Sequence, residues 1–305
     1  MSKRSAAWLA GWIALGALCA VARAQEGVGD VVYVPTPQTV VEAMLKMAKV
    51  GPNDYLIDLG SGDGRIVVTA AKKYGTRGFG VDLDTVLLKR AHESAKREGV
   101  TDRANFIEQN LFETDLAQAT VITSYLLPEM NEKLRPKILK LKPGTRVVAH
   151  DYHMGEWRPD DNDTLVVPEK TVGNPGISYI FMWYVPANAA GTWQAAVPVA
   201  GQTLAVDVSF DQRFQMLSGN AQINQRPAQI QGARVKGEEV TFWLVTGSGA
   251  GAIRHEFNGK LQGDTLTGIL RVHAGKKVGE AQFSAKRTAP GKLDLSAAEP
   301  PAAAL

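Results

Sequence analysis

Hydrophobic residues follow two different periods in the first part of the chain. Between residues 39 and 50 they recur every three or four positions, which predicts a helix with one apolar face. Short apolar runs of strand length follow, each separated from the next by a helical stretch. The predicted strands lie at 56–58, 78–82, 104–108, 121–125 and 146–150, and the predicted helices at 65–73, 84–97 and 128–141. This alternation is typical of a mostly parallel sheet with helices on both faces.

Two further apolar segments, near 165–167 and 177–185, have the character of antiparallel strands. They would complete a seven-stranded sheet, so we predict an α/β domain of Rossmann-like architecture over residues 31–185. The third helix has Asp84 as its predicted N-cap and Gly99 just behind its end, which are ordinary start and stop signals.

The pattern changes after residue 185. The segment Pro186-Ala-Asn-Ala-Ala-Gly191 is predicted to be a linker. Residues 192–287 contain no convincing helical period; short runs rich in Val, Phe, Leu and Ile alternate instead with glycine-containing turns. This pattern predicts an all-β domain of seven or eight strands, either a barrel or a sandwich. Residues 288–305 carry Pro, Ala and charge without periodicity and are predicted to be disordered.

The first 24 residues resemble an export signal. Lys3 and Arg4 precede an apolar run over 6–22, and Ala22-Arg-Ala24 fits a cleavage site. A cleaved signal peptide predicts an exported, periplasmic protein. The alternative is that the segment stays uncleaved and anchors the protein in the inner membrane, with the body again outside the cytoplasm.

Composition removes several function classes. The formal net charge is +3, and the loss of Lys3, Arg4 and Arg23 with the signal would leave 31 basic and 31 acidic residues. A neutral chain lacks the electrostatic footprint of a nucleic-acid binder, so no nucleic-acid partner is expected. The single cysteine, Cys19, lies inside the signal segment. The mature chain would therefore form no disulfide and use no cysteine nucleophile.

The most informative run spans residues 55–64, where a short strand ends on Asp58 and breaks into Gly60-Ser-Gly-Asp-Gly64. A strand, a glycine turn and a helix start allow a ligand to approach bare backbone N–H groups. A dinucleotide fingerprint would need its third glycine at position 65, which is Arg65. The Asp-x-Gly-x-Gly-x-Gly spacing instead resembles motif I of class I S-adenosylmethionine (SAM) methyltransferases.

A second acidic residue supports a nucleoside cofactor. Asp82 ends the second predicted strand, where a carboxylate can accept hydrogen bonds from both ribose hydroxyls. The third predicted strand leads to Asn110 and Leu111, where methyltransferases commonly bind adenine. The carbonyl oxygen of an amide could accept a hydrogen bond from the adenine amino group.

Two more segments connect motif I to one family. Tyr33-Val-Pro-Thr-Pro37 precedes the motif, and Leu126-Leu-Pro-Glu129 follows the fourth predicted strand. With residues 58–66, they resemble the small lysine N-methyltransferase family that includes the mitochondrial enzymes acting on the adenine nucleotide translocase and the ATP synthase c-subunit. The resemblance covers residues 31–155 and does not extend to the all-β domain.

This resemblance implies SAM as the cofactor and a lysine side chain of a protein as the methyl acceptor. It also keeps membrane proximity through an uncleaved N-terminus open as the alternative, because the mitochondrial relatives carry a hydrophobic N-terminal segment. Tyr33 and Thr36 would close over the methionine end of SAM. The complete set of implied cofactor-binding residues is Tyr33, Thr36, Asp58, Gly60, Ser61, Gly62, Gly64, Asp82, Leu83, Asn110 and Leu111.

A lysine acceptor must lose a proton before it can attack, since its ordinary pKa is about 10.4. The candidate catalytic residues by position are Tyr125, Glu129 and Asp151. Each has a structural alternative: packing at the end of the sheet, the first turn of a helix, and the cap of a loop, respectively. His150 and His153 flank Asp151, but the residues alternate along an extended segment and no metal site is expected.

Two other functions remain open on the sequence alone. A small-molecule methyltransferase would need a deep pocket behind the fourth and fifth strands. A non-catalytic envelope-binding protein could retain the fold without turnover, since SAM is made in the cytoplasm and the signal exports this chain. Nucleic-acid amine methyltransferases carry Asp/Asn-Pro-Pro-Tyr/Phe after strand four, where this chain has Ser124-Tyr-Leu-Leu-Pro128.

Overall fold

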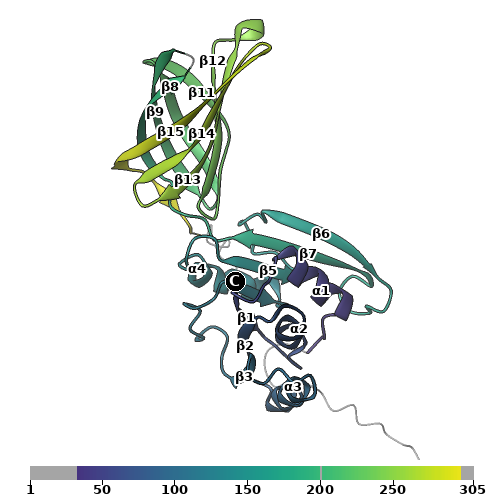
Figure 1. Ribbon diagram of the computed structural model, residues 1–305. Coiled ribbons are helices and arrows are strands. Elements are labelled where there is room, and N and C mark those ends of the chain that lie inside the picture. The colour runs from purple at the N-terminus through teal and green to yellow at the C-terminus, as the bar shows by residue number, and fades with distance from the viewer. Residues whose placement is uncertain (1–32, 200, 297–305) are drawn as a thin grey trace, which may run out of the picture.

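The computed structural model describes residues 33–199 and 201–296, which form two sheets (Figure 1). The first is seven-stranded, in the order β3-β2-β1-β4-β5-β7-β6. Strands β1 to β5 are parallel, and β7 runs antiparallel to both of its neighbours. Its strands are β1 (Tyr55–Leu59), β2 (Arg77–Asp82), β3 (Ala104–Glu108), β4 (Val121–Ser124), β5 (Arg146–His150), β6 (Asp161–Val167) and β7 (Gly176–Tyr184). The predicted Rossmann-like sheet is confirmed.

Four helices cover this sheet: α1 (Gln38–Met47), α2 (Arg65–Tyr74), α3 (Thr85–Arg97) and α4 (Pro128–Ile138). Adjacent residues of a strand point to opposite faces, so Leu56 and Ile57 belong to two separate cores. The first core holds the apolar stripes of α1, α2 and α3. The second holds α4 through Leu134 and Ile138. The predicted cap of α3 is confirmed, since the Asp84 carboxylate accepts from the backbone N–H groups of two residues in the first turn.

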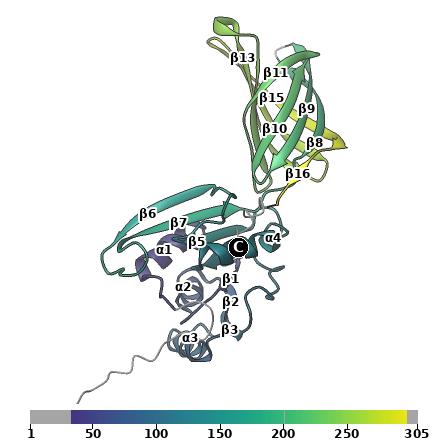
Figure 2. The same cartoon turned by 180° about the vertical axis from the view of Figure 1, so that it is seen from behind.

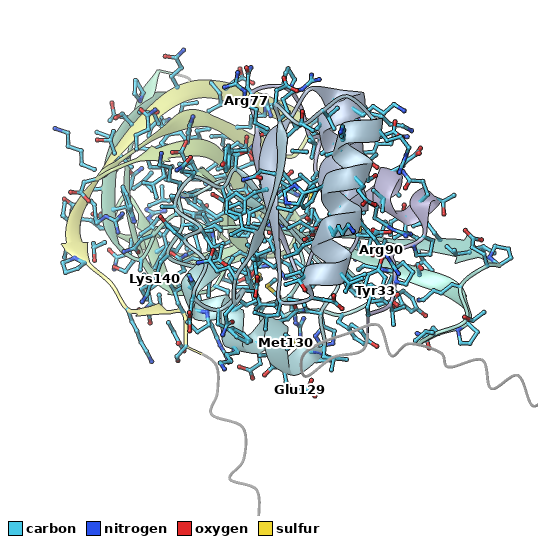
Figure 3. All side chains as sticks on the ribbon, turned by 90° about the horizontal axis from the view of Figure 1, so that it is seen from below. Tyr33, Arg77, Arg90, Glu129, Met130 and Lys140 are labelled. Atoms are coloured by element: carbon cyan, nitrogen blue, oxygen red, sulfur yellow. The ribbon has the colours of Figure 1, made fainter. Side chains whose placement is uncertain are left out.

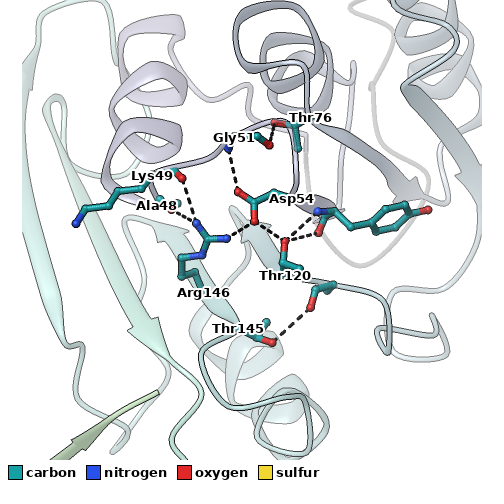
Figure 4. A network of polar contacts seen from close by, with 10 residues as sticks. Ala48, Lys49, Gly51, Asp54, Thr76, Thr120, Thr145 and Arg146 are labelled. Carbon is teal, nitrogen blue, oxygen red and sulfur yellow. Dashed lines mark hydrogen bonds and ion pairs between the residues drawn. The ribbon is translucent and has the colours of Figure 1, made fainter. Parts of the chain in front are cut away.

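The N-terminal ends of β1 and β5 are joined by a polar network (Figure 4). The Arg146 guanidinium pairs with Asp54 and donates to the Ala48 carbonyl at the end of α1, at 2.6 Å. Asp54 also accepts from the Thr120 hydroxyl at 2.7 Å and from the Gly51 N–H at 2.9 Å. This network fixes α1 against the edge of the sheet where the parallel strands begin.

The second sheet closes on itself, because β9 pairs with both β8 and β10 (Figures 1 and 2). Its eight antiparallel strands are β8 (Gly191–Val199), β9 (Gln202–Arg213), β10 (Met216–Ile223), β11 (Arg226–Lys236), β12 (Glu239–Thr246), β13 (Ile253–Gln262), β14 (Thr265–Ala274) and β15 (Lys277–Pro290), with a short 3₁₀ turn, η1 (Gly249–Gly251), before β13. The barrel alternative is therefore confirmed over the sandwich. Its interior is filled by a contacting row of aromatic rings, Phe210, Phe242, Phe257 and Phe283.

The segment predicted as a linker is packed between the two sheets. Residues 186–190 are buried except Asn188. The Ala187 N–H donates to the Gly237 carbonyl at 2.7 Å, and the buried Gln212 amide bonds the backbone of both Ala187 and Ala189. A buried backbone needs such partners, so this segment holds the barrel in one position instead of tethering it loosely.

A barrel side chain completes the core of the first sheet. Phe214 lies in the turn between β9 and β10 at φ 50°, is 3% exposed, and stacks on Trp157 with a centroid distance of 6.4 Å. The buried Arg135 of α4 lies beside the same ring, 5.5 Å from its centroid. Arg234 of β11 pairs with the buried Asp160 at 2.7 Å. The barrel and the α/β sheet therefore share a core.

The predicted disordered tail was wrong at its start. Strand β15 continues to Pro290, and β16 (Leu293–Asp294) pairs in parallel with β9. The Asp294 carbonyl accepts from the Phe214 N–H at 3.1 Å, and Leu295 packs on the shared core. Tertiary contacts order this segment although it lacks any period of its own. The predicted signal segment, 1–24, lies outside the described residues.

Within residues 33–199 and 201–296, none of the helices has the length and apolarity needed to cross a bilayer.

Replacing Phe214 by Ala is expected to lower the free energy of unfolding by roughly 3–5 kcal/mol, because it opens a cavity in the shared core. Urea unfolding followed by tryptophan fluorescence measures this change. The control is Met216→Ala at the start of β10, where the side chain is 54% exposed and a change within about 0.5 kcal/mol is expected. If Phe214→Ala unfolds with the same free energy as the unaltered chain, Phe214 does not contribute to a core shared by the two domains.

Candidate functional site

A cavity of about 280 Å³ opens at the carboxyl ends of the parallel strands. Figure 3 shows Tyr33 and Met130, which line it, at one end of the sheet and Arg77, at the start of β2, at the other. Among the predicted site residues, those lining the cavity are Tyr33, Thr36, Asp58, Gly60, Ser61, Asp82, Leu83, Asn110, Leu111 and Tyr125. Gly62, Gly64, Glu129 and Asp151 do not line it. The order of the strands brings these distant segments together, as expected for a doubly wound sheet.

Gly62 and Gly64 serve the turn itself and do not line the cavity. Both have left-handed φ values, 52° and 77°. A Cβ at Gly62 would lie 2.3 Å from the Tyr33 ring, and one at Gly64 would lie 2.5 Å from the Phe106 ring. The Gly62 N–H donates to the Asp82 carboxylate at 2.8 Å. The missing side chains thus admit the protein's own rings and fix the turn to the end of β2.

Asp58 is a buried carboxyl group at the cavity wall, 2% exposed. Burial raises its pKa to about 7, and the nearby Asp82 and Asp63 add to the rise. The Thr123 hydroxyl donates to it at 2.7 Å and opposes the shift. A cation placed in the cavity would favour the charged carboxylate, so this group is suited to an ammonium ligand.

The buried Ser61 hydroxyl of the lining has no hydrogen-bond partner in the described part of the chain. Burial raises the pKa of the Tyr33 phenol, and the Asp63 carboxylate that its hydroxyl faces raises it further. Buried polar atoms are normally satisfied, so the Ser61 hydroxyl indicates a polar ligand beside it. With the Asp82 carboxylate and the apolar Leu111 and Leu83, the lining matches a molecule that has a sugar, an aromatic base and a zwitterionic end. The residues present fit SAM.

The segment 33–37 crosses the cavity as a strap and is held from two sides. The Arg65 guanidinium donates to the Thr36 carbonyl at 2.8 Å while it pairs with Asp63. The Thr36 hydroxyl lies 3.3 Å from His150 Nδ1, and His150 Nε2 lies 3.0 Å from the Ser178 hydroxyl. Burial lowers the pKa of His150 to about 4, so the ring is neutral at pH 7. A neutral imidazole can donate at one nitrogen and accept at the other, which joins the strap to β7.

The three candidate catalytic residues have different positions. Tyr125 lines the cavity, and its hydroxyl donates to Asp151 Oδ2 at 3.1 Å. Asp151 stands behind it, with its side chain 4% exposed. Glu129 is exposed in the first turn of α4 and lies away from the cavity (Figure 3). The catalytic prediction for Glu129 finds no geometric support, while Tyr125 and Asp151 form one unit.

The side chain of Asn110, predicted to bind adenine, already takes part in a hydrogen bond within its own turn. Its side-chain oxygen already accepts from the Phe112 N–H at 3.0 Å, closing the turn after β3. A carbonyl oxygen has a second lone pair, so one further hydrogen bond can still form.

Sequence reasoning missed the contribution of α4 to the cavity. Met130 and Lys133, three residues apart on one helix face, line it, and the Lys133 ammonium lies 4.1 Å from the Phe112 ring centroid. The i, i+3 spacing on a predicted helix directly after strand four could have identified both. Among the described residues, no group of His, Cys, Asp and Glu is arranged to bind a metal ion.

The family match to this chain lies within the α/β domain. The profile of a family described as the ANTKMT methyltransferase domain matches residues 58–161. A protein-lysine N-methyltransferase of Saccharolobus islandicus is 46% identical over 136 residues, which are 44% of this chain and 84% of that protein. The lysine N-methyltransferase of the ATP synthase c-subunit from Rattus norvegicus is 36% identical over 131 residues, 42% of this chain and 59% of that protein. The chain thus spans most of the archaeal relative and little more than half of the rat one.

One solved structure with high identity is named an RNA methyltransferase. It comes from Salinibacter ruber, holds S-adenosyl-L-homocysteine (SAH), and is 46% identical, with a TM-score of 0.45. The likeness covers 50% of this chain and 94% of that one.

The pKa of Asp58 predicts how cofactor affinity depends on pH. Because the carboxyl is protonated below about pH 7, affinity for SAH should fall up to tenfold per pH unit as pH decreases from 7. Asp58→Asn should bind SAH roughly 10- to 100-fold more weakly near pH 8 and lose this dependence. Calorimetric titration between about pH 5.5 and 8 measures both effects. Asp102→Asn, a distant exposed acid, is the control. A pH profile shared by Asp58→Asn and the unaltered chain would contradict this account.

Proposed function

Because the chain belongs to the ANTKMT family of SAM-dependent methyltransferases, we propose that it transfers the methyl group of SAM to lysine side chains of a protein. The observation that carries this proposal is the relation to the archaeal protein-lysine N-methyltransferase, at 46% identity over 84% of that protein. The family match at 58–161 contains the glycine turn, Tyr125 and Asp151. The segments that build the cavity are therefore largely those shared with the family.

The cavity residues divide the cofactor between them. Asp82 would accept from the ribose hydroxyls, and Asn110 and Leu111 would face the adenine. Asp58 would bind the ammonium of the methionine end, and the buried Ser61 hydroxyl is available to its other polar groups. SAM supplies an electrophilic methyl group on a sulfonium, so the protein has to hold donor and acceptor in line.

Tyr125 provides the acceptor end of the cavity. Burial raises the pKa of its phenol, and the Asp151 charge raises it further, so the hydroxyl stays protonated at neutral pH. It donates to Asp151, which leaves the phenol oxygen free to accept a hydrogen bond from a neutral lysine amine and to direct the amine lone pair. The N–CH₃ bond forms as the S–CH₃ bond breaks, SAH is released, and the proton lost from the amine goes to solvent.

Several observations favour a protein acceptor over other classes. The Asp/Asn-Pro-Pro-Tyr/Phe signature of nucleic-acid amine methyltransferases is missing after β4, where Tyr125 stands. The relatives named above as lysine N-methyltransferases act on proteins according to their names. The RNA methyltransferase name of the bacterial structure makes RNA the competing acceptor to be tested.

We further propose that the substrate lies in the cell envelope. The basic, apolar and A-x-A order of residues 1–24 supports export, either with cleavage or with retention as a membrane anchor. Envelope proteins are therefore the first acceptors to examine.

The proposal predicts that the purified chain transfers tritium from methyl-labelled SAM to envelope proteins, and that acid hydrolysis releases the label as Nε-methylated lysine. Asp82→Ala is expected to lose roughly 10- to 100-fold in SAM affinity, because it removes hydrogen bonds to a charged group. Its labelling at a low SAM concentration should fall by the same factor. The same reaction with cytosolic proteins and with total RNA tests the competing acceptors.

Label recovered in RNA nucleosides, and none in lysine, would refute the proposal. SAH binding without any transfer would favour the non-catalytic alternative instead. Preferential labelling of cytosolic over envelope proteins would refute only the proposed location.

A further inference from the structure

A buried lysine lies behind Tyr125, in a loop that is otherwise exposed. Lys170 belongs to the connection between β6 and β7, where Pro168, Glu169 and residues 171–175 are all exposed. Its own side chain is only 4% exposed. A lysine in an exposed loop would ordinarily extend into solvent, so its burial requires specific partners.

Those partners connect the loop to the acceptor end of the cavity. The Lys170 ammonium lies 2.5 Å from Asp151 Oδ2 and donates to the Ile177 carbonyl at 2.5 Å. The same carboxylate oxygen accepts from the Tyr125 hydroxyl. The loop is closed around Lys170 by backbone bonds, since its N–H donates to the Val167 carbonyl and its carbonyl accepts from the Gly176 N–H, each at 3.0 Å.

Asp151 is held in an uncommon backbone conformation, at φ 61°. Its N–H donates to the Tyr179 carbonyl at 2.7 Å, and its Oδ1 accepts from the Tyr179 N–H at 3.1 Å. A left-handed non-glycine residue persists where its surroundings determine it fully, and such residues gather at functional sites. The ionisable groups that face this carboxylate are Lys170, Tyr125, His150 and, across the Tyr125 ring, Tyr152.

We infer that Lys170 is a positioning residue for methyl transfer: its ammonium holds the Asp151 carboxylate, and this carboxylate orients the Tyr125 hydroxyl at the acceptor end of the cavity. The inference rests on the proposed function, and it assigns a residue of the β6–β7 loop a role in positioning the acceptor. A buried carboxylate without a counter-ion takes up a proton. Protonated Asp151 would then donate to Tyr125 instead of accepting from it, and the released Tyr125 O–H could donate to the acceptor amine and occupy the lone pair that has to attack the methyl group.

The test compares Lys170→Met with the unaltered chain, using tritium transfer from SAM to envelope proteins and, as a defined acceptor, poly-L-lysine. The apparent kcat of the variant should fall about 10- to 100-fold near pH 7, because the acceptor is misaligned. The ratio of the variant's kcat to that of the unaltered chain should rise from about pH 7 to about pH 9, because a higher pH favours the charged form of a carboxyl group that has lost its partner. SAH affinity should stay within about twofold, because Lys170 and Asp151 do not line the cofactor cavity. Glu169→Gln, the exposed neighbour, is the matched control and should behave as the unaltered chain.

Removing one partner of a buried pair costs roughly 3–5 kcal/mol of stability, so a second comparison guards against a variant that fails to fold. Lys170→Met combined with Asp151→Asn removes both charges together. If Lys170 acts through Asp151, the double variant should be no slower than Asp151→Asn alone.

Losses that add in the double variant, an equal loss of kcat at every pH, or a parallel loss of SAH affinity would each overturn the inference and leave Lys170 a purely structural role. Normal kcat in Lys170→Met would overturn it as well, while the proposed function would stand. If the unaltered chain methylates no lysine, the proposed function fails, and the inference fails with it.

Discussion

The carboxyl ends of parallel strands meet at one edge of a sheet, and the rest of this structure depends on that constraint. Residues far apart in the sequence arrive at one edge, because Asp58 and Asp82 lie at the carboxyl ends of β1 and β2 while Tyr125 and Asp151 directly follow β4 and β5. The opposite edge carries a structural polar network, with Arg146 and Asp54 at its centre. The cavity residues and this structural network thus lie at opposite ends of the parallel strands.

The barrel supports the part of the α/β domain that lines the cavity. Its Phe214 completes the core that α4 packs against, and α4 also carries Met130 and Lys133 into the cofactor cavity. Helix α4 therefore contacts the barrel on one side and the cavity on the other. The barrel interior is itself filled with aromatic rings, so its contribution is made through this contact and through its outer surface.

The sequence predicted the elements whose signals are local. The seven strands, the Asp84 cap and the positions of Asp58 and Asp82 in one cavity wall each follow from a few adjacent residues and from strand order. What it could not predict depends on distant contacts. Pro290 and Leu293 lack any periodic signal and are ordered by pairing with β8 and β9, respectively. Nothing near Lys170 in the sequence indicates that its ammonium will contact Asp151. Glu129 lies shortly after β4, as a catalytic residue would, but it is on the solvent-exposed side of α4.

The most direct test of the account is a crystal structure of the chain bound to SAH. The account predicts the ribose on Asp82, the ammonium on Asp58 and the thioether sulfur directed toward the Tyr125 hydroxyl, with Lys170 still paired to Asp151. A thioether directed away from Tyr125, or SAH bound outside this cavity, would contradict it.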